Sequence, residues 1–170
     1  MNSTFKYLFF FLLTVSSAFA SKTNMLPSGW RLPTKLELGD DWRKKDRNLF
    51  ASIVGNFDDD KIPDEAKILV STDNKKIGIF IWWGKDKSGK PVEVFNESEI
   101  SQIHSMGIEN FSSGNYQTAC GKGYFDCKIG ETKNIKIDHD SINYFKTESA
   151  NSVFSFDKSK KLFKRTWLSD

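Results

Sequence analysis

The sequence predicts an α+β fold made mainly of antiparallel β-sheet, with one or two short helices, in a single domain. Two observations lead to this prediction. Short apolar runs alternate with turns rich in Gly, Asp, Asn, Ser and Lys, which is the pattern of strands joined by hairpins. No internal repeat or low-complexity linker divides residues 21–170, and a segment of this length is sufficient for one hydrophobic core.

The predicted strands follow the apolar runs. Leu49–Val54 and Ala66–Ser71 flank an acidic turn and predict a hairpin. Ile77–Trp83 is apolar at almost every position, as expected for a central strand covered on both faces. The other predicted strands are Val92–Phe95, Tyr116–Ala119, Ile135–Asp138, Ser152–Asp157 and Leu162–Leu168, the last two forming a C-terminal hairpin.

Helices are expected in two places. The charged stretch Asp40–Lys45 predicts one short helix. Between Asn96 and Phe111 the apolar residues fit either a short helix ended by Gly107 or an irregular strand.

The first 20 residues have the pattern of a cleavable secretory signal peptide. One basic residue, Lys6, precedes an apolar run, and Ala18-Phe-Ala20 has the small-x-small pattern that signal peptidase recognises. The run is shorter than the roughly 20 apolar residues of a membrane span, and no later segment is apolar enough for one. We therefore expect a mature chain that begins at Ser21 and lies in the periplasm or outside the cell.

The charge balance argues against nucleic acid as a partner. Without Lys6 the 25 Lys and Arg residues become 24, against 22 Asp and Glu, which leaves a net charge of +2. A nucleic-acid-binding surface would show as a clustered basic face instead.

Two cysteines, Cys120 and Cys127, stand close together in the sequence. In an oxidising compartment such a pair most simply forms one local disulfide. A metal site would need two more ligands, and a redox-active pair more often has two residues between the cysteines.

The acidic turn has the spacing of a calcium loop. Asn56, Asp58, Asp60 and Asp64 occupy positions 1, 3, 5 and 9, and Ile62 at position 7 would supply a backbone carbonyl. Calcium takes six to eight hard oxygen ligands, and alternate residues of a tight turn can point them at one centre. The alternative is a solvated acidic turn without an ion.

The segment Gly55-Asn-Phe-Asp-Asp-Asp-Lys-Ile-Pro-Asp64 resembles the Gly-Asp-Phe-Asn-Gly-Asp-Gly-x-x-Asp loop of FG-GAP and VCBS-type repeats, which joins two strands. This resemblance implies a calcium site between strands. Lys61 stands where those loops carry glycine and Asn56 replaces the first aspartate, so we expect weak affinity for Ca²⁺.

Most of residues 21–170 is similar to a group of small secreted bacterial proteins. The shared segments are Gly29-Trp-Arg-Leu-Pro-Thr34, Gly121-Lys-Gly-Tyr-Phe-Asp-Cys127, Glu148-Ser-Ala-Asn-Ser152 and Phe163-Lys-Arg-Thr-Trp-Leu-Ser-Asp170. This similarity implies export from a bacterial cell, and it brings no activity with it.

No complete catalytic motif is evident. His139, between Asp138 and Asp140, is the best candidate for a general base, but the sequence has no Gly-x-Ser-x-Gly elbow to supply a serine nucleophile. Two acids beside a histidine are also an ordinary solvated turn, and a metal site built from His104 and His139 lacks further ligands.

Three functional hypotheses remain. The favoured one is an exported, non-enzymatic binding protein, for instance an immunity or inhibitor protein against a toxin that acts in the cell envelope. The second is a small exported hydrolase that uses His139 or the acidic loop. The third is a calcium-stabilised module without further activity.

Overall fold

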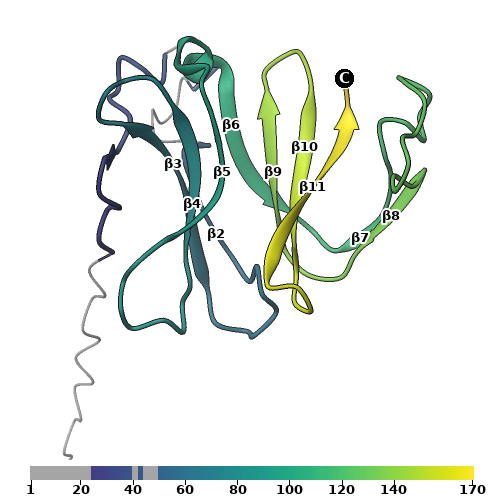
Figure 1. Cartoon of the computed structure of the whole chain (residues 1–170), viewed down its shortest axis with the longest axis horizontal. Helices are drawn as coiled ribbons and strands as arrows, with labels where there is room; N and C mark the ends of the chain where they lie inside the picture. Colours follow the sequence, from purple (N-terminus) through teal and green to yellow (C-terminus); the bar gives the residue numbers. More distant parts are fainter. Residues whose placement is uncertain (1–23, 40–41, 44–49) are drawn as a thin grey trace, which may run out of the picture.

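The computed structural model describes residues 24–39, 42–43 and 50–170 as an almost entirely antiparallel β structure (Figure 1). The predicted signal peptide and most of the predicted helix Asp40–Lys45 lie outside the described residues. The strands are β1 (Trp30–Arg31), β2 (Ser52–Gly55), β3 (Asp64–Ser71), β4 (Ile77–Trp82), β5 (Val92–Glu97), β6 (Met106–Phe111), β7 (Gly114–Gln117), β8 (Asn134–Ile137), β9 (Ser141–Lys146), β10 (Asn151–Asp157) and β11 (Leu162–Ser169).

The helical part of the predicted α+β fold is much smaller than expected. Within the described residues the one helix is a short 3₁₀-helix, η1 (Ile100–Ser105), and β6 follows it directly. Ile103 of η1 is buried, and Met106, Gly107 and Ile108 continue the burial as a strand. Both alternatives for residues 96–111 therefore hold in part, a helical turn first and then a strand.

Two sheets form the body of the molecule and appear as neighbouring layers in Figure 1. The first has the order β1-β3-β4-β5, with β2 also paired to β3, and the second has the order β11-β10-β9-β6. The predicted hairpin around the acidic turn is confirmed, with Gly55 opposite Asp64 in the register of β2 and β3. The C-terminal hairpin is confirmed as well, with Phe156 opposite Phe163.

The main core lies between the two sheets. Alternate residues of β3 and β4 point inward, and they meet the inward side chains of β6, β9 and β10, because successive side chains of a strand point to opposite faces. The fully buried residues of this core are Leu38, Phe57, Ala66, Ile68, Val70, Ile77, Ile79, Ile81, Ile103, Ile108, Ile142, Tyr144 and Phe154.

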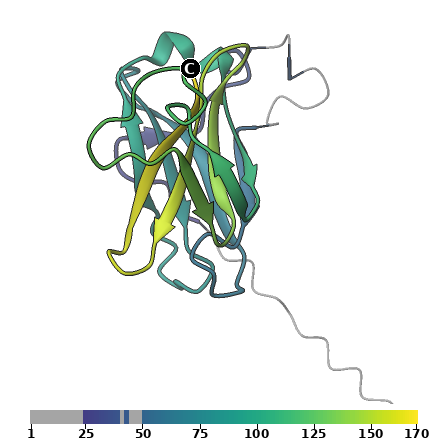
Figure 2. The ribbon, with the colours of Figure 1, turned by 90° about the vertical axis from the view of Figure 1, so that its right-hand side faces the viewer.

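Smaller elements cover the outer faces of both sheets. On the first sheet, Trp30 packs edge-on against Phe80 with 4.7 Å between ring centroids, and the indole of Trp82 donates a hydrogen bond to the carbonyl of Met25 (3.1 Å). The two-stranded ribbon β7–β8 lies over the second sheet (Figure 2). Its Ile137 packs against Val153 and Leu168. Both sheets therefore bury apolar side chains on their outer faces as well.

The two sheets meet closely on one side and stay apart on the other. Next to β2, the amide of Ile108 in β6 donates a hydrogen bond to the carbonyl of Phe50 (2.8 Å). On the opposite side β5 and β11 are the edge strands of their sheets. We call the boundary between β5 and β11 the open seam.

Candidate functional site

The acidic turn folds as the predicted hairpin connection, but a lysine lies at its centre. Lys85, in the loop after β4, forms an ion pair with the carboxylate of Asp58, and its Nζ lies 3.3 Å from Oδ2 of Asp60. The side chain of Asp58 is only 5 % exposed. The ammonium group thus provides the positive charge that closely spaced aspartates require.

The remaining oxygens of the turn accept hydrogen bonds from backbone amides. Oδ1 of Asn56 accepts from Lys61, and Oδ1 of Asp60 accepts from Ile62 (3.0 and 2.8 Å). Asp64 is buried and joins two loops, because its carboxylate accepts from the amides of Phe57 and Gly84 (2.9 and 2.8 Å). Burial raises the pKa of this carboxyl group. These bonds fix the shape of the turn without an ion.

Lys61 adopts a backbone conformation that favours glycine. Its φ is 70°, in the left-handed region that glycine adopts without steric cost. The next residue is Ile62, whose backbone carbonyl is the predicted ligand, and its side chain is exposed.

Calcium binding by this turn stays a prediction. In the described part of the chain, no group of three or more His, Cys, Asp or Glu side chains is arranged to hold a metal ion. A calcium ion at Asn56, Asp58, Asp60, Ile62 and Asp64 would have to displace Lys85 and several backbone amides. In the arrangement present, these residues fit a turn neutralised by lysine better than a calcium site.

His139 lies beside the acidic turn, in the connection between β8 and β9. Its neighbour Asp140 accepts a hydrogen bond from the amide of Asn56 (3.0 Å), which ties the two turns together. Nε2 of His139 is buried and has no hydrogen-bond partner among the described residues, and the Ser141 hydroxyl bonds the His139 carbonyl rather than its ring (3.4 Å). His104 is exposed at the end of η1. The geometry therefore assembles neither a Ser–His pair nor a two-histidine metal site from these residues.

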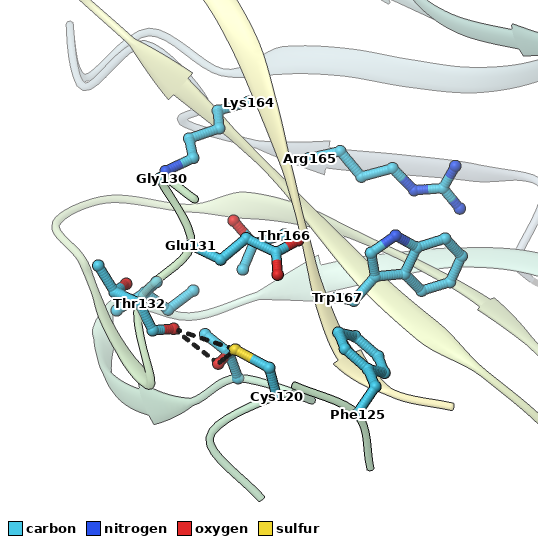
Figure 3. Close-up of a pocket in the computed structure, with 11 residues that line it drawn as sticks. Cys120, Phe125, Gly130, Glu131, Thr132, Lys164, Arg165, Thr166 and Trp167 are labelled. Atoms are coloured by element: carbon cyan, nitrogen blue, oxygen red, sulfur yellow. Dashed lines mark hydrogen bonds between the residues drawn. The ribbon is translucent and has the colours of Figure 1, made fainter. Parts of the chain in front are cut away.

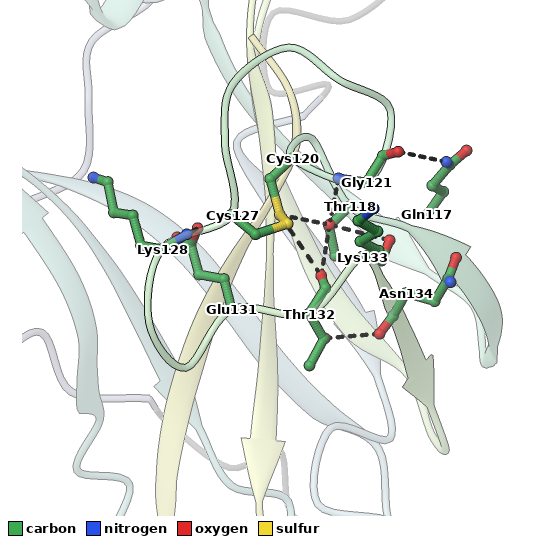
Figure 4. Close-up of a disulfide and its surroundings, with 10 residues drawn as sticks. All are labelled: Gln117, Thr118, Cys120, Gly121, Cys127, Lys128, Glu131, Thr132, Lys133 and Asn134. Carbon is green, nitrogen blue, oxygen red and sulfur yellow. Dashed lines mark hydrogen bonds between the residues drawn. A yellow bond between two sulfur atoms is a disulfide. The ribbon is translucent and has the colours of Figure 1, made fainter.

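The predicted disulfide between Cys120 and Cys127 is present, with 5.0 Å between the Cα atoms (Figure 4). It closes a short loop inside the long connection from β7 to β8. The hydroxyl of Thr118 donates to the carbonyl of Thr132 (2.7 Å), and the amide of Gly121 donates to the same hydroxyl (3.1 Å). The threonine thus holds the two ends of the connection together, and the disulfide closes a smaller loop between them.

Further bonds attach the disulfide loop to the last strand. The amide of Ala119 donates to the carbonyl of Trp167 (2.8 Å), and the ammonium of Lys122 donates to the carbonyl of Leu168 (2.8 Å). The loop therefore has a fixed place on the edge of β11, although most of its side chains face solvent.

Several large apolar side chains are exposed on this loop and beside it. Tyr124 is 54 % exposed, Phe125 is 36 % exposed, and Ile129 is fully exposed. Trp167 of β11, 39 % exposed, lines the same hollow of about 390 Å³ as Phe125. Figure 3 shows the ring of Phe125 next to that of Trp167, at the end of a small cavity of about 50 Å³. We call these four residues the disulfide-loop platform.

The open seam forms a second concave surface. At the beginning of β5 and β11 a groove of about 640 Å³ is lined by Trp83, Phe156 and Phe163, with lysines at its rim. Trp83 stacks on Phe163 with 5.9 Å between ring centroids and 7° between ring planes. These rings pack on one another and so cover this part of the core. Their faces are therefore less accessible to a ligand.

The platform was not predicted from the sequence, although a signal was present. Tyr124-Phe125 and Ile129 stand in a stretch rich in Gly, Lys and Asp, where no strand could bury them. Apolar residues in a polar, disulfide-closed loop indicate a binding surface better than the loop itself does, because a loop with only a structural role does not need them.

The chain matches no protein-family model, and neither curated proteins nor solved structures give a match to it. Of the helices in the described residues, none has the length and apolar character that a membrane crossing requires.

Proposed function

We propose that this protein is an exported, non-enzymatic binding protein that recognises a protein partner through the disulfide-loop platform. The observation that carries the proposal is the exposure of Tyr124 and Phe125 on a loop that is held in place covalently and by hydrogen bonds, together with Ile129 just after this loop and Trp167 on β11. Aromatic residues are the side chains that most often contribute the largest binding energies at protein interfaces.

The energetics favour this surface over the other exposed apolar positions. Burying one large apolar side chain contributes about 1.5–3 kcal/mol. A loop that is already ordered before binding loses little conformational entropy on association, so more of that energy remains as affinity. The disulfide between Cys120 and Cys127 supports such preorganisation.

An immunity or inhibitor role against a toxin in the cell envelope is the form of this function that we favour. Such a protein needs export, a stable fold and a specific surface, and it needs no catalytic group. The hydrolase alternative is less well supported, because the Ser141 hydroxyl bonds the His139 backbone and the Asp58 carboxylate is paired with Lys85.

The immunity role can be tested in the cells that produce the protein. Deletion of its gene should make these cells sensitive to wild-type sister cells in mixed culture, and the full chain should restore resistance. Phe125→Ser and Ile129→Asp should fail to restore resistance at equal protein levels. Leu36→Asp is the matched control, because Leu36 is a 90 % exposed apolar residue outside the platform. Unchanged sensitivity of the deletion strain would exclude the immunity role.

A further inference from the structure

Arg165 is held in the open seam by aromatic rings. It lies on β11 opposite Phe154 of β10, and its guanidinium carbon is 4.1 Å from the ring centroid of Trp167 and 4.6 Å from that of Phe95 in β5. Nε donates a hydrogen bond to the hydroxyl of the buried Ser152 (2.9 Å). Figure 3 shows the side chain extending beside the indole of Trp167, away from Cys120. The guanidinium group therefore has a fixed position and orientation.

The terminal nitrogens of this guanidinium donate no hydrogen bond to any described residue, and no described carboxylate forms an ion pair with it. Glu97, across the seam, instead accepts a hydrogen bond from the hydroxyl of Tyr144. Arg31 shows the contrast, because its two terminal nitrogens donate to both carboxylate oxygens of Glu37 (2.8 and 2.6 Å). Burial lowers the pKa of Arg165, and the nearby Glu97 and Tyr144 act in the opposite direction.

A pocket of about 170 Å³ opens beside Arg165 at the end of the seam. Its wall includes the apolar side chains of Met106 and Phe145 and the indole of Trp167, together with Glu97 and Lys146. The ammonium of Lys146 donates one hydrogen bond to Gln102 (2.7 Å), which ties this side chain to η1. The pocket thus joins an available guanidinium to an apolar wall of limited size.

We propose that this pocket binds a carboxylate that is carried on a compact apolar group. The planar guanidinium presents paired donors that match the two oxygens of a carboxylate. Glu97 and Glu99 in the wall repel any anion, and they repel a dianion such as phosphate more strongly than a carboxylate with its single charge. The apolar wall then selects the group attached to the carboxylate. The pocket shares Trp167 with the disulfide-loop platform but does not include Phe125 or Ile129, and this inference does not depend on the proposed function.

A purely structural role for Arg165 makes a different prediction. If stacking across the seam were its whole task, added carboxylates would not change its environment. The test is a titration of the mature domain with N-acetyl-L-leucine, followed by ¹⁵N–¹H NMR signals of the Arg165 guanidinium and the Trp167 indole. We expect saturable shifts with a dissociation constant on the order of 1 mM, as usual for so small a ligand.

The controls separate carboxylate recognition from other causes. N-acetyl-L-leucinamide, which has the same apolar group without the charge, should give no saturable shift. Arg165→Lys should weaken the binding of the acid at least about tenfold, whereas Arg31→Lys, at an arginine already paired with Glu37, should not. The source of the carboxylate is either an acidic side chain of a partner protein or a small free acid. A peptide with an internal glutamate beside a leucine distinguishes the two. Equal responses to the acid and its amide, an equal response to inorganic phosphate, or unaltered binding by Arg165→Lys would overturn the proposal.

Discussion

Lys85 and Asp58 form an ion pair at the centre of the acidic turn, where a calcium ion would otherwise have to bind. The two residues come from different loops, on either side of β3 and β4, and Lys85 also approaches Asp60. A cation supplied by the chain itself therefore competes with any external cation for the same oxygens.

Removal of this lysine should destabilise the domain. We expect Lys85→Met to lower the free energy of unfolding by about 1–2 kcal/mol, because Asp58 stays buried without its partner while the exposure of Lys85 limits the loss. Chemical denaturation measures this change. Lys87→Met, at an exposed lysine in the same loop, should have no effect.

The same substitution should increase the response to calcium. For a dissociation constant of about 1 mM, calcium at about 10 mM stabilises by about 1.4 kcal/mol, which is about 3–5 °C for a domain of this size. Melting curves with calcium and with chelator should differ by this amount in Lys85→Met and by less in the wild type. Equal shifts in both proteins would show that the ammonium does not compete with the ion.

Glu37 should make stability depend on acidity. Hydrogen bonds from Arg31, aided by the amide of Thr34, lower the pKa of this carboxyl group to about 2. Because the pKa is lower in the folded state, the stabilisation is present above the ordinary pKa of the group and is lost as the pH falls toward 2.

We therefore expect Glu37→Gln to be less stable than the wild type at pH 7, by about 1–2 kcal/mol after allowance for solvent screening. The difference should shrink below about pH 4.5 and nearly vanish near pH 2. Denaturation at a series of pH values measures it, with Glu148→Gln, an exposed acid in the β9–β10 turn, as control. A constant difference over this range would contradict the role of the Arg31–Glu37 pair.

The disulfide should stabilise the loop more than the rest of the fold. The two cysteines are seven positions apart in the sequence, so loop closure accounts for about 2.5 kcal/mol at most. A Cys120→Ser/Cys127→Ser variant should keep its sheets, seen by circular dichroism, and lose amide protection between Thr118 and Lys133 in hydrogen exchange. Unchanged protection of this segment would mean that hydrogen bonds alone hold the loop.

Export should yield a mature chain that begins at Ser21. Intact-mass spectrometry of the protein recovered from the cell envelope and medium measures the processed N-terminus. Recovery of chains that retain Met1 would contradict the predicted signal peptide.

The strands that could be predicted from the sequence are those with strong local patterns. Ile77–Trp83 is apolar throughout, and the acidic turn with its flanking runs specifies the β2–β3 hairpin. In contrast, Ser141–Lys146 was missed as a strand because its polar residues Ser141 and Asn143 are buried by tertiary contacts. The amide of Asn143 bonds Glu109 on β6 (2.7 Å), a partner far away in the sequence.

The same limit applies to the candidate sites. The disulfide is a local feature and could be predicted, whereas Lys85 reaches the acidic turn from 27 residues beyond Asp58. The turn at Thr34 is also a local feature, because the two residues that form it are three positions apart in the sequence. The Thr34 hydroxyl accepts from the amide of Glu37, and Glu37 accepts from the amide of Thr34 (3.2 and 2.7 Å), which is the capping-box arrangement. The platform and the Arg165 pocket depend on how distant strands are placed.

Site-specific photo-crosslinking in the producing cells tests the central claim most directly. A photoreactive amino acid replaces Ile129 in one variant and Leu36 in a matched variant, since both positions are exposed and apolar. The account predicts one discrete protein adduct from position 129, absent from position 36, which excess unlabelled mature domain competes away and which the Cys120→Ser/Cys127→Ser variant weakens. The same adducts from both positions, or none from position 129, would contradict the claim that the disulfide-loop platform binds a partner.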